Sequence, residues 1–210
     1  MCLILRISGR KQPLLIRLAA QALGDGAIAI FPTETCYGLG CDATDETAIK
    51  RIFEIKKRNR KKALPIIVSN LQTASKYCYI TGTAKTLIQK FMPGPLTLVV
   101  KAKSNLPKAL TANSGKIAFR ISGNKTANAL AKELGKPIVA TSANIEGKKE
   151  IYSGKEAIEK FAQCADVIID AGALPKRKPS TVYDVASHKI LRAGKISVKQ
   201  IDRALDRDKQ

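Results

Sequence analysis

The sequence predicts a single α/β domain, built on a mixed β-sheet with helices packed against it. Short apolar runs, which are typical of buried strands, alternate along the chain with longer segments whose apolar residues recur at helical spacing. Several connections between strands are too short for a parallel crossover, so some strands must pair antiparallel. The 210 residues contain no internal repeat and no linker, and we expect one domain over residues 1–210.

The beginning of the chain is predicted to form a strand, a helix and a second strand. The first strand lies near Cys2–Ile7, and Pro13 opens a helix that Gly24 can close. The continuous apolar run Ala27–Phe31 is of the kind expected of a strand buried on both faces. These three segments begin the alternation on which the fold prediction rests.

A polar segment follows this second strand. Pro32 cannot donate a hydrogen bond to a sheet, and Gly38 and Gly40 admit backbone conformations that are closed to other residues. We therefore expect Thr33–Tyr37 to form a loop at the end of the strand. This loop places hydroxyl groups and the carboxylate of Glu34 at the edge of the sheet.

The middle of the chain continues the alternation. Asp45 is a typical N-cap, and the helix that follows it carries Ile49 and Phe53 on one face. Pro93-Gly94-Pro95 stops the last helix of this part of the chain. Beyond the Asp45 helix, the predicted order is a strand at Leu64–Ser69, helices at Leu71–Tyr77 and Thr83–Phe91, a strand at Leu96–Lys101, a polar loop at Thr111–Gly115 and a strand at Lys116–Ile121.

The last third of the chain contains three predicted helices and four short strands. Ser153 with Glu156, and Ser197 with Gln200, have the spacing of a capping box at the start of a helix. A further helix at Thr126–Leu134 ends at a glycine. The strands are predicted at Ile138–Ala140, Val167–Asp170, Val182–Ala186 and Lys189–Leu191.

The composition of the chain indicates which kinds of partner it binds and in which cellular compartment it is found. With 37 Lys and Arg against 17 Asp and Glu, the net charge of +20 favours polyanionic partners, namely nucleic acid, nucleotides or acidic membrane surfaces. No apolar run approaches the roughly 18–20 residues that cross a bilayer. Five cysteines without a CxxC pair fit a reducing compartment, so we expect a cytoplasmic protein without a disulfide framework. The single histidine, His188, is interpreted as a strand-end surface residue and argues against a zinc site.

Polar side chains recur where the predicted strands end. If these ends share one rim, they line a cleft of hydrogen-bond donors that suits an anionic ligand, because arginine matches phosphate and carboxylate while hydroxyl and amide groups fix orientation. The alternative is that Ser, Thr and Asn are simply common in turns. The chain has neither a GxGxxG nor a GxxxxGK[ST] phosphate loop. The residues concerned are Thr33, Thr35, Arg120, Thr141, Ser142, Asn144, Ser180, Thr181 and Arg192.

Two clusters of basic residues in the sequence lie close to these predicted strand ends. Six of the seven residues in Lys56–Lys62 are basic, and Lys176-Arg177-Lys178 comes just before Ser180. A charge run at the end of a helix is usually solvated, and cations there also complement the helix dipole. A polyanion-binding surface is the other interpretation.

Seven motifs, taken in order, resemble those of the YrdC-type threonylcarbamoyl-adenylate synthases. Together they span roughly residues 12–197, nearly the whole chain. The motifs are PTETCYGLG at Pro32–Gly40, the pair Lys56-x-Arg58, MPGPLTLV at Met92–Val99, FRIS at Phe119–Ser122, TSAN at Thr141–Asn144, PSTVYD at Pro179–Asp184 and LRAGKI at Leu191–Ile196.

The resemblance implies a twisted open α/β fold with a large, positively charged cavity. It also implies a reaction in which L-threonine, bicarbonate and ATP give threonylcarbamoyl-AMP and pyrophosphate. This is the first step in making N6-threonylcarbamoyladenosine at position 37 of tRNA, so a downstream threonylcarbamoyl transferase complex is an implied partner. Mg²⁺ is expected to arrive with ATP, held mainly by phosphates and water, and no dedicated metal site is expected.

The resemblance also assigns roles to individual residues. Lys56, Arg58, Ser142 and Asn144 match the family's signature around the nucleotide phosphates, and Arg192 matches a further nucleotide contact. Positions that hold the threonine are matched by Thr35, Arg120 and Ser180. The family's proline after the KxR pair, its histidine in the next strand and its RxPxH motif are replaced here by Asn59, by Ile66-Ile67 and by the segment Arg120–Asn124.

Two functions remain open at this point. The first is the ATP-dependent synthase, in which Lys56 and Arg58 contact phosphate directly while the other basic residues, Arg60, Lys61 and Lys62, lie nearer solvent. The second is a non-catalytic RNA-binding module for tRNA or double-stranded RNA, which the net charge of +20 favours.

Overall fold

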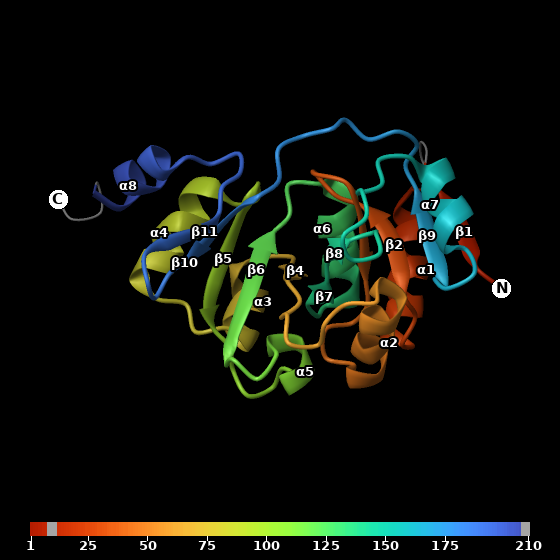
Figure 1. The fold of residues 1–210 in the computed structure, drawn as a ribbon, viewed down its shortest axis with the longest axis horizontal. Helices are drawn as coiled ribbons and strands as arrows, with labels where there is room; N and C mark the ends of the chain where they lie inside the picture. Colours follow the sequence, from red (N-terminus) through yellow and green to blue (C-terminus); the bar gives the residue numbers. More distant parts are fainter. Residues whose placement is uncertain (8–11, 207–210) are drawn as a thin grey trace.

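Two mixed β-sheets form the framework of the chain in a computed structural model that describes residues 1–7 and 12–206 (Figure 1). The N-terminus and helix α8 (Val198–Asp206) lie at opposite ends of the long axis. The strands of the first sheet, in spatial order, are β1 (Leu3–Arg6), β9 (Val167–Asp170), β2 (Ala29–Pro32), β3 (Tyr37–Gly40) and β8 (Thr141–Ser142). Those of the second sheet are β11 (Lys189–Arg192), β10 (Thr181–Asp184), β5 (Leu96–Lys101), β6 (Lys116–Ile121), β4 (Ile66–Val68) and β7 (Ile138–Val139).

Both sheets mix parallel and antiparallel pairs, as the short connections predict. In the first sheet β2 is parallel to β9 and antiparallel to β3. In the second sheet β10 is parallel to β5 and antiparallel to β11. The α/β class and the mixed pairing are therefore confirmed.

The prediction of one sheet is wrong, because the chain changes sheets at Ala140. Just before this residue, β7 pairs with β4 at the edge of the second sheet, and just after it β8 pairs with β3 at the edge of the first. The two strands contain two residues each, so the polypeptide passes from one sheet to the other almost without a connection. Strands of this length carry no periodicity from which a sequence could reveal the change.

Helices pack on both sheets and enclose most of the apolar side chains. In Figure 1, α1 and α6 lie near the first sheet, and α4 and α8 lie at the C-terminal end of the molecule. One cluster of buried residues joins α1 and α6 to strands of both sheets, and a larger cluster fills the rest of the core. The helices are α1 (Gln12–Gly24), α2 (Glu46–Lys56), α3 (Leu71–Tyr77), α4 (Gly82–Phe91), α5 (Lys108–Thr111), α6 (Lys125–Leu134), α7 (Gly154–Phe161) and α8 (Val198–Asp206). None of the helices in the described parts of the chain is long and apolar enough to cross a membrane.

Two of the three predicted N-terminal helix caps are confirmed. The Asp45 carboxylate accepts hydrogen bonds from the backbone N–H groups of Thr47 and Ala48 at the start of α2. At the start of α8, the Ser197 N–H donates to the Gln200 side chain at 2.9 Å, and the Gln200 N–H donates to the Ser197 hydroxyl at 3.3 Å. The prediction of a capping box at the start of α7 is wrong.

At α7, Ser153 occupies the N-cap position but its side chain makes no capping hydrogen bond. The carboxylate of Glu156 accepts instead from Lys160 Nζ, one turn further along the same helix, at 2.7 Å. Glu156 has the spacing of a capping box with Ser153, but Lys160 lies four residues further along the helix and can form an ion pair with it. The ion pair with Lys160 forms in place of the capping hydrogen bond.

The polar segment after β2 is a tight hairpin turn, not the longer loop that the sequence predicts. Tyr37 already belongs to β3, and residues 33–36 alone join the two antiparallel strands. Gly38 and Gly40 lie inside β3, where backbone conformation does not require glycine. The reason for glycine at position 40 is close approach, because a Cβ atom there would lie 1.8 Å from the Val139 carbonyl oxygen.

Candidate functional site

Residues of both sheets line one cavity of about 400 Å³. Six of the eight residues that the resemblance assigns to the site line this cavity, and they come from six separate segments of the chain. These residues are Thr35, Arg58, Arg120, Ser142, Ser180 and Arg192. The prediction that polar strand ends meet at one place is confirmed for seven of the nine residues concerned, which are Thr33, Thr35, Arg120, Thr141, Ser142, Ser180 and Arg192, but not for Asn144 and Thr181.

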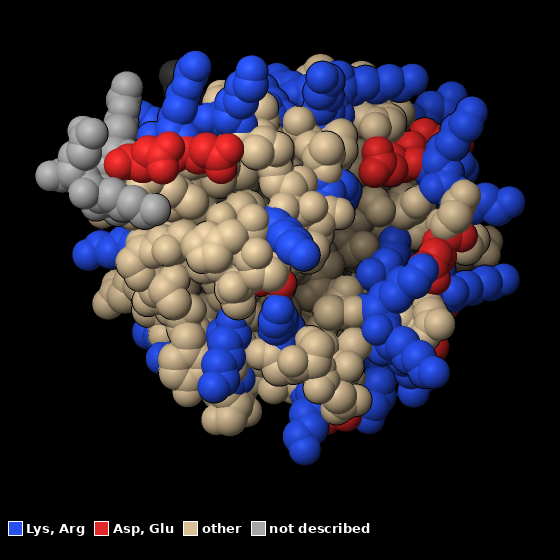
Figure 2. All heavy atoms as spheres, turned by 60° about the vertical axis from the view of Figure 1, so that its left-hand side comes forward, with Lys and Arg blue, Asp and Glu red and all other residues tan. Residues whose placement is uncertain are grey.

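The lining is strongly basic. Arg58, Arg120, Arg177 and Arg192 reach the cavity, whereas Glu150 is the one acidic residue among the described residues that line it. Lys and Arg side chains also flank a hollow on the face drawn in Figure 2. Such a lining attracts anionic ligands and favours groups with several negative charges.

Arg177 and Glu150 were absent from the predicted site. Arg177 belongs to the basic cluster that precedes Ser180, so the sequence did carry a signal for it. Glu150 had no such signal, because it lies in an irregular segment before α7 and its neighbours are common surface residues. Its carboxylate accepts a hydrogen bond from the Tyr152 hydroxyl at 2.7 Å, which holds it in place.

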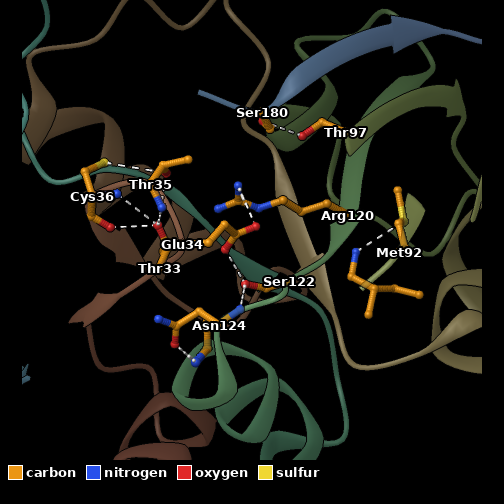
Figure 3. A network of polar contacts seen from close by, with 12 residues as sticks. Thr33, Glu34, Thr35, Cys36, Met92, Thr97, Arg120, Ser122, Asn124 and Ser180 are labelled. Carbon is orange, nitrogen blue, oxygen red and sulfur yellow. Dashed lines mark hydrogen bonds and ion pairs between the residues drawn. The ribbon is translucent and has the colours of Figure 1, made fainter. Parts of the chain in front are cut away.

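The wall that the second sheet forms is organised around Ser180. Its hydroxyl lies 2.9 Å from the Thr97 hydroxyl on β5 (Figure 3). It also accepts a hydrogen bond from Arg192 Nη2 at 2.9 Å. Arg192 further donates through Nε and Nη2 to the Ser180 carbonyl oxygen, at 3.2 and 3.0 Å. Partial burial, followed by repulsion from Arg120, lowers the pKa of Arg192.

The hairpin turn supplies the opposite wall and is held by its own side chains. The Thr33 hydroxyl donates to the Cys36 carbonyl oxygen at 2.7 Å and accepts from the N–H groups of Thr35 and Cys36 (Figure 3). Thr33 is buried and its hydroxyl is committed to the turn, although both Thr33 and Thr35 are among the residues that line the cavity. Burial raises the pKa of the Cys36 thiol to about 11, which keeps it in the thiol form at neutral pH.

Lys56 and Asn144 lie behind the cavity wall and are not among its lining residues. The side chain of Lys56 is buried, and its ammonium donates to the carbonyl oxygens of Ser142 at 2.6 Å and Asn144 at 2.7 Å. A third bond reaches Asn144 Oδ1 at 3.0 Å. All three protons of the ammonium are thus used within the protein, and Lys56 fixes the segment that carries Ser142 instead of presenting a free charge to the cavity.

The burial of Lys56 changes its acidity. Desolvation lowers the pKa of Lys56 to about 8, and the nearby charge of Arg58 adds to the effect. The three oxygen acceptors hold the charged form in place despite its burial. Lys56 therefore titrates much closer to neutral pH than an ordinary lysine.

The basic run beyond Lys56 divides into a part in the cavity and a part at the surface. Arg58 is half-buried, lines the cavity and donates through Nη2 to the Ala63 carbonyl oxygen at 3.1 Å. Arg60, Lys61 and Lys62 are exposed, and Lys62 forms an ion pair of 2.6 Å with Glu146. This division agrees with the prediction that the outer residues lie nearer solvent.

The described residues contain no group of three or more His, Cys, Asp or Glu side chains that could hold a metal ion. His188 is exposed and lies in the turn between β10 and β11, with a φ of 54° and its Nδ1 3.2 Å from the Tyr183 hydroxyl. It lies at a strand end on the surface, as the sequence predicts. It is not among the residues that line the cavity.

Comparison with known proteins adds the following similarities. The profile of the family Sua5–YciO–YrdC, described as telomere recombination, matches residues 21–194. The chain is 34% identical over 208 residues to a threonylcarbamoyl-AMP synthase of Pyrococcus abyssi (strain GE5 / Orsay), and this match covers 98% of the chain and 61% of that protein. A threonylcarbamoyl-AMP synthase of Pseudoalteromonas translucida (strain TAC 125) is also 34% identical, over 84% of the chain and 96% of its own length.

Solved structures agree in fold. The crystal structure of P. abyssi Sua5 complexed with L-threonine has a TM-score of 0.89 and 33% identity, covering 98% of this chain and 61% of that one. The crystal structure of E. coli YciO has a TM-score of 0.84 and 26% identity, covering 96% and 98% of the two chains. The chain thus spans about three fifths of the length of its P. abyssi relative but nearly all of YciO.

Proposed function

The chain belongs to the Sua5–YciO–YrdC family, and from this premise we propose that it is a threonylcarbamoyl-AMP synthase. It would join L-threonine, bicarbonate and ATP to give threonylcarbamoyl-AMP and pyrophosphate, for the modification of tRNA at position 37. The observation that carries the proposal is the convergence of Thr35, Arg120 and Ser180 with Arg58 and Arg192 on one cavity. The same cavity then holds residues for an amino acid and for a nucleotide.

The chemistry requires charge stabilisation more than a side-chain nucleophile. Bicarbonate supplies CO₂ and loses hydroxide, and the threonine amine adds to this CO₂ with formation of an N–C bond. The proton released from the amine and the hydroxide combine to water, and the resulting carbamate oxygen attacks the α-phosphorus of ATP. The bond to the β-phosphate oxygen breaks, and pyrophosphate leaves. Negative charge develops on phosphate oxygens in this step, where Arg58 and Arg192 can stabilise it. The protonated state of the Cys36 thiol and the position of His188 outside the lining fit a site that uses no nucleophile.

Mg²⁺ is proposed to enter with ATP. The cavity lining offers one carboxylate, that of Glu150, among four arginines, and this donor set does not fit a metal held by the protein alone. It does fit a magnesium ion whose ligands are phosphate oxygens and water. Once bound, that ion would neutralise part of the triphosphate charge.

The proposal extends to the cellular setting. All five cysteines are free, which supports a reducing compartment such as the cytoplasm. The net charge of +20 supports contact with tRNA or double-stranded RNA in addition to ATP, and the product would pass to a threonylcarbamoyl transferase. RNA binding without catalysis is the second candidate, which the same charge favours.

Pyrophosphate release tests the proposal against this second candidate. We expect purified protein with ATP, Mg²⁺, bicarbonate and L-threonine to release pyrophosphate well above a control without threonine. Release that does not depend on threonine, or none at all, would reject the synthase. Filter binding of tRNA by the same preparation then determines whether the RNA-binding function stands alone.

Arg58→Ala is expected to lower kcat/KM for ATP by roughly ten- to a hundredfold, because each lost charge-assisted contact costs about 1.5–3 kcal/mol. The matched control changes the exposed residues Arg60, Lys61 and Lys62 to glutamine together. These residues attract an anionic ligand over a distance but do not contact it, so kcat/KM of the triple variant should fall only a fewfold. The difference from wild type should become smaller as the salt concentration rises, because salt screens the same attraction in the wild-type protein. Steady-state rates at several salt concentrations make the comparison. Equal losses that do not respond to salt would place the outer residues in the site.

A further inference from the structure

The ion pair between Glu34 and Arg120 joins the two sheets at the cavity (Figure 3). Arg120 Nη1 lies 3.2 Å from Glu34 Oε1, and the two side chains are only 11% and 10% exposed. Glu34 comes from the hairpin turn of the first sheet, and Arg120 is the penultimate residue of β6 in the second. The guanidinium therefore enters the cavity with a carboxylate already beside it.

Ser122 holds that carboxylate from the other side. Its hydroxyl donates to Glu34 Oε2 at 2.5 Å and accepts from the Asn124 N–H at 3.2 Å. Asn124 is the N-cap of α6 and accepts from the Thr126 N–H at 2.9 Å. A continuous chain of hydrogen bonds thus runs from the start of α6 through Ser122 and Glu34 to the ion pair with Arg120.

This pair makes Arg120 unlike the other arginines of the cavity. Among the four lining arginines, Arg120 is the one that forms an ion pair with a carboxylate of the described residues. The pair carries no net charge, whereas Arg58, Arg177 and Arg192 add unpaired positive charge to the same space. A phosphate dianion gains most from unpaired charge. A carboxylate monoanion can still take hydrogen bonds from Arg120, because the ion pair is not a hydrogen bond to Glu34 Oε1 and leaves the N–H groups of the guanidinium available.

We propose that Glu34 is a positioning and specificity residue, which fixes the Arg120 guanidinium and cancels its charge so that this corner of the cavity takes a carboxylate in preference to a phosphate. The inference rests on the proposed function, in which an amino acid and a triphosphate must be kept apart in one basic cavity. Without Glu34, phosphate groups would compete for Arg120 and displace the amino acid. Glu34 itself does not touch the reacting atoms.

Calorimetric titration with L-threonine, with and without inorganic phosphate, tests this inference in the absence of turnover. Wild-type protein should bind threonine with little effect of phosphate. Glu34→Gln should weaken threonine binding by about ten- to a hundredfold, as expected for a displaced guanidinium, and phosphate should now compete with threonine. Glu34→Asp keeps the charge and should restore the preference for threonine over phosphate.

Ser122→Ala is the matched control, since it removes a hydrogen bond to Glu34 but leaves the charge. It should weaken threonine binding a fewfold without introducing competition by phosphate. If Glu34→Gln fails to fold, Ser122→Ala serves as the test of whether the position of Glu34 affects threonine binding. The inference is overturned if Glu34→Gln binds threonine like wild type. It is also overturned if Glu34→Gln weakens the binding of threonine and of ATP equally, with no competition by phosphate, which is the pattern of a purely structural pair. A wild-type protein that binds no threonine would instead reject the proposed function.

Discussion

Replacing Lys56 with methionine is expected to lower threonine-dependent pyrophosphate release by about a hundredfold and to destabilise the fold by about 3 kcal/mol. Methionine fills a similar volume but leaves three oxygen acceptors, two of Asn144 and one of Ser142, without their common donor. The segment that carries Ser142 into the cavity would then lose its anchor. Urea denaturation and steady-state kinetics measure the two effects.

The balance between the two effects distinguishes two roles for Lys56. A loss of ATP affinity with unchanged stability would mean that the ammonium contacts phosphate directly, as the sequence predicts. A loss of both would mean that it holds the wall of the cavity, as the geometry indicates. Lys56→Arg is a demanding control, because a planar guanidinium cannot point three hydrogen bonds at acceptors arranged around an ammonium. It should remain defective although the charge is kept.

The lowered pKa of Lys56 adds a dependence on pH to the same comparison. Between about pH 8 and the ordinary lysine value near 10.4, the folded protein has lost a proton that the unfolded chain still binds. The free energy of unfolding contributed by this group therefore rises with pH across that window. Activity should fall as the pH rises across the same window. Neutral Lys56 has only two N–H donors for its three acceptors, so it holds the segment of Ser142 less firmly. The difference between wild type and Lys56→Met, measured at each pH, isolates both trends from other titrating groups.

Gly40→Ala is expected to destabilise the protein by about 3 kcal/mol or more, since the added Cβ would meet backbone instead of a movable side chain. This Cβ atom would lie 1.8 Å from the Val139 carbonyl oxygen and 2.9 Å from the Phe31 ring. Strand β3 would therefore have to move away from Val139, which lies just before the chain passes from the second sheet to the first. Gly82→Ala is the matched control. No atom lies within 4 Å of its added Cβ, and at the start of α4 alanine should leave stability unchanged or slightly raised. Urea denaturation of both variants checks the expectation, and equal stability would contradict it.

Much of the site could be predicted because its residues follow strands. The apolar runs that end near Thr35, Arg120 and Ser142 are visible in the sequence, and strand ends tend to meet at an edge of a sheet. The hairpin strand β3 was missed because glycine and proline normally signal loops, whereas here glycine serves a close backbone contact. Sequence shows which backbone conformations a residue permits, but not which distant chain segment passes beside it.

Partnerships between distant charges could not be predicted in the same way. Lys56 looks like the first member of a basic run, and only the fold reveals that its acceptors are 86 and 88 residues further along the chain. Glu34 and Ser122 are likewise separated by 88 residues, and neither has a neighbour in sequence that indicates the pairing. Motif similarity identified the cations of the site. The groups that restrain them are known only from the geometry.

The pairing of the chain's first strand with one near its end bears on how the protein is made. Leu3 lies opposite Val167, and Ala29 is also paired with Val167, so the first sheet lacks the strand that joins β1 to β2 until late in synthesis. While the ribosome is still translating, the β2–β3 hairpin can form locally, but the edge of β2 that pairs with β9 has no partner. Folding of such non-local parallel sheets is slow, and the nascent chain is exposed to aggregation during that interval. The first sheet can therefore be completed only after β9 has left the exit tunnel.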